Sequence, residues 1–223
     1  MATVARKIGR GRRPLVHEGR ELRCSWRFER EALAEGLSVV AGVDEVGRGA
    51  LCGPVVACAV VLGRGFDTEG LDDSKRLTRL QREALAKRVR EAAEAWGLGS
   101  ADASEIDRLN ILRATHLAMR RALDGLAVRP DVVLVDGREA AGLGVPQRAI
   151  VKGDALSFSI AAASIVAKVA RDATMREWDE RCPGYGLSRN KGYASEDHRD
   201  ALRRLGPSRI HRRSFNGTQA WLF

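Results

Sequence analysis

Short apolar runs alternate with longer amphipathic stretches along the chain, which predicts an α/β fold. The apolar runs at residues 38–43, 54–62, 132–135 and 149–151 predict strands, and a further short strand is expected near residues 96–103. The run at 54–62 is apolar without alternation, so we expect it to be buried on both faces of a sheet. Because no repeat or low-complexity linker separates these elements, we expect one compact domain.

Helical spacing of apolar residues occurs in the stretches between and after the predicted strands. Thr78 and Gln81 have the spacing of a capping box, which predicts a helix from residue 78 to about residue 95. A weaker box from Ser104 to Asp107 predicts a second helix, which should end at Gly125. A long alanine-rich helix and a short arginine-rich helix are expected over residues 157–178 and 195–205.

The charge of the chain favours a polyanionic partner such as nucleic acid. Its 223 residues include 38 basic and 29 acidic side chains, which gives a formal charge of +9. Only six of the basic residues are lysine, so an arginine-rich composition is an alternative explanation. Residues 1–20 carry six basic side chains against one acidic side chain, which predicts a mobile basic arm.

Cysteine usage and hydropathy indicate a cytoplasmic protein. The four cysteines form no C-x-x-C pair, so a zinc site is not expected, and free cysteines suit a reducing compartment. The longest apolar run, residues 55–62, is too short to cross a bilayer, and the basic N-terminus is not followed by the apolar segment of a signal peptide. Nothing in the sequence suggests more than a monomer.

Carboxylates follow three of the predicted strands. Asp44 and Glu45 end the first apolar run, Asp136 ends the run at 132–135, and Asp154 follows the last strand. Because ligands gather outside the strand ends of open α/β sheets, these four side chains should lie close together. They would repel one another strongly without cations. Two Mg²⁺ or Mn²⁺ ions held by shared carboxylates would relieve that repulsion and align a water for attack on a phosphodiester.

Each of these acids also has a structural interpretation. The Asp136-Gly137 dipeptide is typical of a turn, and Asp154 could cap the helix that follows it. Asp44 or Glu45 alone could be an ordinary surface carboxylate. The recurrence of acids at three strand ends favours a site over these alternatives.

A series of short segments resembles bacterial ribonuclease HII, the type 2 ribonuclease H, in the order of that family. They cover roughly residues 38–205. The resemblance implies a ribonuclease H-like fold, with a mixed central sheet flanked by helices and a small helical C-terminal part. The segments are residues 43–49 (VDEVGRG), 52–55 (CGPV), 73–75 (DSK), 109–112 (LNIL), 135–137 (VDG), 152–154 (KGD), 159–168 (SIAAASIVAK) and 190–193 (NKGY).

The resemblance implies a metal-dependent endonuclease that cuts RNA in RNA–DNA hybrids. It also implies cleavage on the 5′ side of single ribonucleotides embedded in duplex DNA, leaving 3′-hydroxyl and 5′-phosphate ends. We expect residues 1–37 to form a basic, partly mobile N-terminal extension, on which the resemblance has no bearing, and residues 38–223 to form the catalytic domain with its C-terminal helical region and tail. The corresponding site residues are Asp44, Glu45, Asp136 and Asp154 for the metal, Gly47, Arg48 and Gly49 for the ribose 2′-hydroxyl, and Tyr193 for the adjoining sugar.

Further side chains are candidates for contacts with the nucleic-acid backbone. They are Lys75, Asn110, Lys168 and Lys191, together with Arg48. Lys168 lies within the long predicted helix and could equally belong to a solvated face. Two other functions share much of the pattern: a nuclease that acts on plain DNA, and a nucleic-acid-binding module without catalysis. The Gly-Arg-Gly segment with Tyr193 argues against the first, and four intact acids argue against the second.

The last five residues, QAWLF, are similar to the short peptides by which bacterial proteins dock on the DNA sliding clamp. Gln219 would provide a hydrogen-bonding anchor, and Leu222 and Phe223 would fill an apolar pocket. The alternative is a terminal apolar stretch that packs on its own domain.

Overall fold

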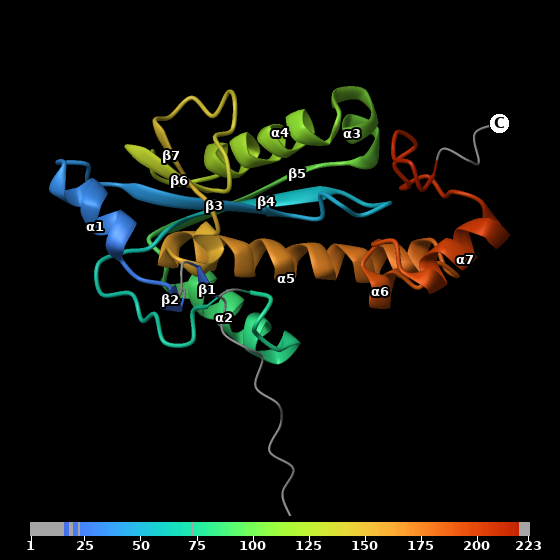
Figure 1. The fold of residues 1–223 in the computed structure, drawn as a ribbon, viewed down its shortest axis with the longest axis horizontal. Coiled ribbons are helices and arrows are strands. Elements are labelled where there is room, and N and C mark those ends of the chain that lie inside the picture. The colour runs from blue at the N-terminus through green and yellow to red at the C-terminus, as the bar shows by residue number, and fades with distance from the viewer. Residues whose placement is uncertain (1–15, 18–19, 22, 73, 219–223) are drawn as a thin grey trace, which may run out of the picture.

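A mixed five-stranded sheet between two layers of helices forms the centre of the computed structural model, which describes residues 16–17, 20–21, 23–72 and 74–218 (Figure 1). The strand order is β5-β4-β3-β6-β7; β4 is antiparallel to both β3 and β5, whereas β6 is parallel to both β3 and β7. The predicted α/β fold is therefore confirmed. The strands are β3 (Val40–Val46), β4 (Val55–Val61), β5 (Ala95–Ala101), β6 (Val132–Asp136) and β7 (Gln147–Ile150), with a separate small pair β1 (Val16–His17) and β2 (Arg20–Glu21).

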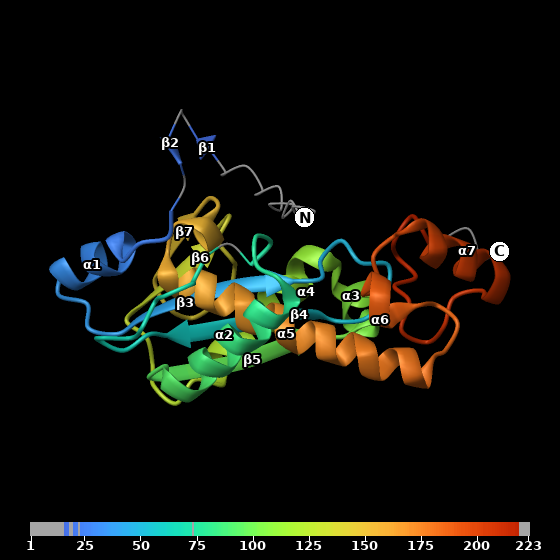
Figure 2. The same ribbon diagram turned by 90° about the horizontal axis from the view of Figure 1, so that it is seen from below.

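The helices cover both faces of this sheet. In Figure 1, α3 and α4 lie on one face, and α5 and α2 lie on the other. Figure 2 shows α1 at one end of the molecule and α6 and α7 beyond the sheet at the opposite end. The helices are α1 (Arg27–Ala34), α2 (Arg79–Ala92), α3 (Ala103–Leu109), α4 (Ile111–Asp124), α5 (Phe158–Arg181), α6 (Leu187–Asn190) and α7 (Glu196–Leu205), and a 3₁₀ turn η1 covers Gly153–Ala155.

Small residues allow the helices to approach the sheet closely. A Cβ on Gly42 of β3 would lie 2.2 Å from the carbonyl carbon of Ser159 on α5, and one on Gly99 of β5 would lie 2.1 Å from the carbonyl oxygen of Ala118 on α4. Every residue of β4 is buried, as the unbroken apolar run predicts, because helices cover both of its faces. This close packing fixes α5 directly beneath the strand that carries the first two acids.

The region between β5 and α4 differs from the sequence prediction. The capping box is formed by Asp102 and Glu105, whose side chains each accept a hydrogen bond from the other's backbone N–H, so the predicted box from Ser104 to Asp107 is wrong. The helix is also not continuous. Asn110 has a φ of +69°, which ends α3, and its side chain accepts the N–H of Arg113 at 3.1 Å to begin α4.

Helix α1 was not predicted, because its buried face packs against residues that are distant in the sequence. Ala32 packs with Val40 and Ile160 in a buried cluster. Glu29 is also buried and accepts hydrogen bonds from the Ser157 hydroxyl at 2.7 Å and the Ser159 N–H at 3.0 Å. The division at residue 37 stays a prediction. In the described part of the chain no helix has the length and apolar character needed to cross a membrane.

Candidate functional site

The pairing of β3, β6 and β7 brings acidic residues to one edge of the sheet. Val43 lies opposite Val135 in the parallel pair β3–β6, so Asp44 and Asp136 are the next residues on adjacent strands. The sequence predicts that the first strand ends at residue 43, before Asp44 and Glu45. Strand β3 instead continues to Val46, so both acids lie within it. Strand β6 ends at Asp136, beside Asp44, and the Asp44 side chain is buried.

Asp154 reaches the same edge through the turn that follows β7. The Gly153 N–H donates to Oδ1 of Asp136 at 2.6 Å, which fixes this turn against the end of β6. Asp154 does not cap α5, because Ser157 is the N-cap and accepts the N–H of Ile160 at 3.3 Å. Asp154 is therefore left available to the site, and the capping alternative is wrong.

All four carboxylates line one cavity of about 240 Å³. Lys75, Lys168 and Tyr193 line the same cavity. A second cavity of about 480 Å³ shares Glu45 and Asp136 with the first and extends along Arg48 and His116. The acids thus lie where two adjoining hollows meet, which leaves room for an extended ligand to pass over them.

Two of the carboxylates, Asp44 and Asp136, have a raised pKa. Burial raises the pKa of Asp44 well above its ordinary value, and the charges of Glu45, Asp136 and Asp154 raise it further. Burial and the Asp154 charge raise the pKa of Asp136 to about 6. A divalent cation would remove this repulsion, and carboxylate oxygens are the ligands that Mg²⁺ and Mn²⁺ prefer. The residues present therefore fit such an ion.

Two basic side chains already contact the acids. The Lys75 amino group donates to Oδ2 of Asp154 at 2.6 Å, and the Arg48 guanidinium donates to Oε1 of Glu45 at 3.0 Å. Because both of these basic side chains are largely exposed, they can exchange a carboxylate for a phosphate at little cost. The structure thus places Lys75 and Arg48 at the rim of the acidic cluster.

The two glycines of the Gly-Arg-Gly loop meet different surroundings. Gly47 has a φ of +93°, and a Cβ there would lie 2.0 Å from Nε of Arg171, so the packing behind the loop requires this glycine. A Cβ on Gly49 would meet nothing within 4 Å. Open space beside Gly49 leaves room for a ligand to approach the backbone of the loop.

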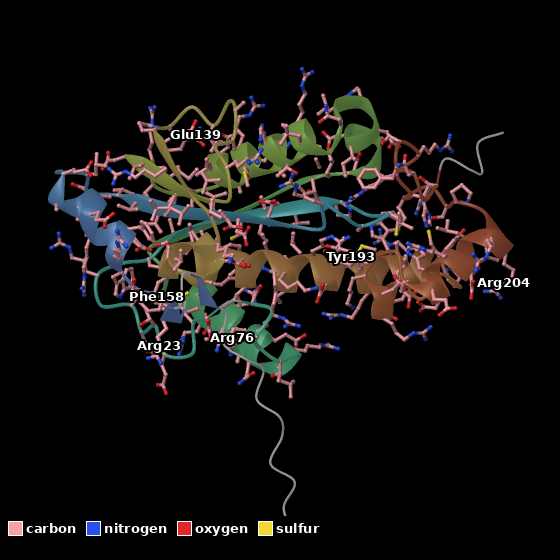
Figure 3. All side chains as sticks on the ribbon, viewed as in Figure 1. Arg23, Arg76, Glu139, Phe158, Tyr193 and Arg204 are labelled. Atoms are coloured by element: carbon pink, nitrogen blue, oxygen red, sulfur yellow. The ribbon has the colours of Figure 1, made fainter. Side chains whose placement is uncertain are left out.

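Tyr193 lies beside α5 (Figure 3). The centre of its ring is 5.4 Å from the guanidinium carbon of Arg171. It is 38% exposed, so one part of the ring remains available to a ligand. Lys168 lines the cavity, but its amino group also donates to Asp172 at 2.6 Å along the helix.

Two other predicted contacts, Asn110 and Lys191, are not among the residues that line this cavity. Asn110 caps α4, and the Lys191 amino group donates to the carbonyl oxygen of Ser188. Asp73 and the tail residues Gln219, Leu222 and Phe223 lie outside the described residues.

Sequence reasoning missed a buried group beneath the Tyr193 loop, because its members are far apart in the chain. Cys52, His198 and His211 place their ligand atoms within 4.8 Å of one another. The Ser208 N–H donates to Nδ1 of His211, so the proton of the neutral ring is on Nε2, which lies 3.1 Å from Nε2 of His198. His198 Nδ1 in turn donates to the carbonyl oxygen of Tyr193 at 2.9 Å. Both rings are thus engaged in hydrogen bonds that support the Tyr193 segment.

Residues 41–218 match the family model of ribonuclease HII, and this match covers more than half of the chain. The chain belongs to the ribonuclease HII family. A ribonuclease HII from Moorella thermoacetica is 54% identical over 190 residues, which are 85% of this chain and 92% of the relative. It follows that the chain is an endoribonuclease, a phosphodiester hydrolase.

Solved structures agree with this family and with the fold. The ribonuclease H2 of Pyrococcus horikoshii is 27% identical and superposes with a TM-score of 0.70 over 82% of this chain and 96% of that one. The ribonuclease HII of Archaeoglobus fulgidus, solved in a complex with PCNA, is 24% identical and has a TM-score of 0.66 over 80% and 95% of the two chains.

Proposed function

We propose that this member of the ribonuclease HII family cuts the RNA strand of RNA–DNA hybrids and incises DNA on the 5′ side of embedded ribonucleotides, leaving 3′-hydroxyl and 5′-phosphate ends. One observation carries the proposal: four carboxylates and Tyr193 line a single cavity, and Glu45 of that cavity contacts Arg48 of the Gly-Arg-Gly loop. The four carboxylates suit hydrolysis of a phosphodiester, and Tyr193 with the Gly-Arg-Gly loop suits recognition of a sugar.

Asp44, Glu45, Asp136 and Asp154 would hold Mg²⁺ or Mn²⁺, with two ions in the complex with substrate. When bound, such ions supply charge stabilisation to the phosphate and lower the pKa of water. The protein fixes the geometry in advance, because Asp44 accepts the Glu45 N–H at 2.7 Å and Asp136 accepts the Gly153 N–H. Lys75 and Arg48 offer positive charge to the phosphates on either side of the scissile bond.

Discrimination between RNA and DNA would reside in the loop and the tyrosine. The 2′-hydroxyl is the group that separates the two sugars, and it lies in a shallow minor groove that a backbone segment can approach. The open space beside Gly49 permits such an approach. The exposed part of the Tyr193 ring offers an apolar face to the next sugar of the strand.

A cleavage assay on paired substrates tests this proposal. Two duplexes of identical sequence would be incubated with Mg²⁺ or Mn²⁺, one containing a single ribonucleotide and the other all DNA, beside a long RNA–DNA hybrid. We expect cleavage of the first and third substrates, with loss of cleavage after addition of EDTA. Cleavage of the all-DNA duplex would instead support a DNA nuclease, and binding without cleavage would support a module that only binds nucleic acid. Asp44→Asn is the matched inactive variant and should still bind the duplex.

The C-terminal QAWLF segment gives a second proposal, that the enzyme docks on the bacterial DNA sliding clamp. The complex of the Archaeoglobus relative with PCNA supports clamp docking for that protein. Deletion of residues 219–223 should abolish binding to the clamp in a surface plasmon resonance experiment and leave cleavage of the single-ribonucleotide duplex unchanged. Equal binding by the truncated chain would refute the proposal.

The four free cysteines support a cytoplasmic location.

A further inference from the structure

Two arginines are completely buried behind the Gly-Arg-Gly loop. Arg171 on α5 and Arg212 in the C-terminal segment are both 0% exposed. Burial of a guanidinium costs several kcal/mol unless its donors are satisfied. In the described part of the chain, every hydrogen-bond acceptor of these two side chains is a backbone carbonyl oxygen. The two arginines therefore hold backbone segments in place rather than forming ion pairs.

Arg212 holds both ends of the loop that contains Gly47 and Arg48. Its Nη2 donates to the carbonyl oxygen of Gly47 at 2.7 Å, and its Nη1 donates to that of Arg48 at 2.8 Å. Its Nε and Nη2 donate to Gly53 at 3.1 and 2.9 Å. The loop backbone is thus bound to one rigid, planar group, and the backbone of Arg212 itself donates to the Leu51 carbonyl oxygen at 2.9 Å.

Arg171 joins this loop to the segment that carries Tyr193. Its Nε donates to the carbonyl oxygen of Pro54 at 2.9 Å, and its Nη1 donates to that of Lys191 at 3.0 Å. The same guanidinium lies against the Tyr193 ring. One side chain therefore contacts both of the elements to which we assign recognition of the sugars.

The histidine pair supports the Tyr193 segment from below. His198 fixes the Tyr193 carbonyl oxygen, and His211, directly before Arg212 in the chain, fixes His198. The Gly192 carbonyl oxygen also accepts the Leu51 N–H at 2.8 Å. Relative movement of the two recognition elements would break several of these buried hydrogen bonds at once, so their spacing is preset before substrate binds.

We propose that Arg171 and Arg212 are positioning residues that set the distance between the Gly-Arg-Gly loop and Tyr193, and thereby favour a ribonucleotide joined to a deoxyribonucleotide over a continuous hybrid. The inference rests on the proposed function. A single embedded ribonucleotide offers one 2′-hydroxyl, so the loop and Tyr193 must engage adjacent sugars at once. A long hybrid offers a 2′-hydroxyl at every nucleotide of its RNA strand and tolerates a less exact spacing.

Geometry, rather than charge, carries this effect. Burial lowers the pKa of both guanidiniums, and that of Arg212, at about 10, is still well above neutral pH. Lysine would keep a positive charge, but its donors diverge from one nitrogen and cannot reach carbonyl oxygens in two segments as the guanidinium fork does. Arg→Lys substitutions therefore separate the contribution of the positive charge from that of the hydrogen-bond geometry.

The test uses Arg171→Lys and Arg212→Lys in the full chain with Mg²⁺, and Arg27→Lys as a control. Arg27 lies on α1 and pairs with Glu31 at 2.8 Å on the surface, away from the cavity. The measured quantity is kcat/KM on a single-ribonucleotide duplex divided by kcat/KM on a long hybrid. We expect this ratio to fall roughly tenfold or more in each buried variant and to stay unchanged in the control.

A merely structural role would lower both activities by a common factor and leave the ratio constant, which would overturn the inference. Hydrogen exchange provides a readout that needs no activity. The amides of residues 47–53 should exchange faster in both buried variants, while those of β4 keep their protection. Unchanged exchange in the loop would equally overturn the inference. Failure of the unmodified enzyme to cut the single-ribonucleotide duplex would refute the proposed function, and the inference with it.

Discussion

The acidic cluster should destabilise the fold when no metal is present, and Asp136→Asn tests this directly. Asn is isosteric with Asp and can still accept the Gly153 N–H, so the substitution removes charge and preserves the hydrogen bond. We expect the metal-free variant to be more stable than the metal-free enzyme at neutral pH and to be inactive. A gain in stability with a loss of activity is the signature of a site that is strained for its function.

The size of the effect follows from the pKa of Asp136, which is about 6 in the folded protein against 3.8 for the free group. This difference in pKa corresponds to ~3 kcal/mol, part of which belongs to the neighbouring acids that titrate together with Asp136, so we expect a gain of about 1 to 3 kcal/mol. Because the folded pKa is raised, the protonated group's favourable contribution is complete below about pH 4 and is lost as the pH rises through about 6.

Urea unfolding in EDTA, at about pH 7.5 and about pH 5, measures this contribution as the difference between variant and unmodified enzyme. The difference should be large at the higher pH and shrink at the lower one. Added Mg²⁺ should stabilise the unmodified enzyme more than the variant. Cleavage by the variant should fall by roughly 10³-fold or more, since several kcal/mol of charge stabilisation depend on the site.

Asp131→Asn is a matched control with the opposite sign. Asp131 precedes β6, and its carboxylate accepts the backbone N–H groups of Ser38 and Val39 at 2.8 and 2.9 Å, which lowers its pKa. Loss of this charge should not stabilise the protein, and cleavage should be unaffected. Equal unfolding free energies for Asp136→Asn and the unmodified enzyme at both pH values would refute the electrostatic argument.

Four further substitutions test other parts of the structure. Gly47→Ala should lower the unfolding free energy by about 1 to 3 kcal/mol, because Gly47 has a positive φ and a Cβ there would clash with Arg171. Gly49→Ala should leave the unfolding free energy nearly unchanged in the same urea titration, because the space around its Cβ is open. Ser157→Ala should cost about 1 to 2 kcal/mol, since it removes the cap of α5 and one hydrogen bond to buried Glu29, and thermal melting would show this as a lower midpoint. Lys75→Met should raise KM for the single-ribonucleotide duplex several-fold and flatten the dependence of KM on salt, and an unchanged salt dependence would argue against a phosphate contact.

Local patterns in the sequence were sufficient for much of the fold. The unbroken apolar run of β4 and the capping box of Thr78 and Gln81 each depend on neighbouring residues, and the structure confirms both. The break at Asn110 was missed because a positive φ leaves no signal in hydrophobic spacing. Helix α1 was missed because the burial of Glu29 and Ala32 depends on partners more than a hundred residues away in α5 as well as on β3.

The acidic residues of the site could be predicted from the sequence, whereas the residues that support the Gly-Arg-Gly loop could not. The acids could be anticipated because parallel strands end at a common edge, so three strand ends in the sequence imply one location in space. The support behind the Gly-Arg-Gly loop could not, because Arg212 reaches Gly47 across 165 residues and looks like any other member of an arginine-rich segment. An arginine on the surface and one that orders two loops differ only in burial, and burial is decided by the whole fold. Chemistry that comes from strand ends is therefore visible in the sequence, whereas the positioning that gives this chemistry its selectivity becomes visible only in three dimensions.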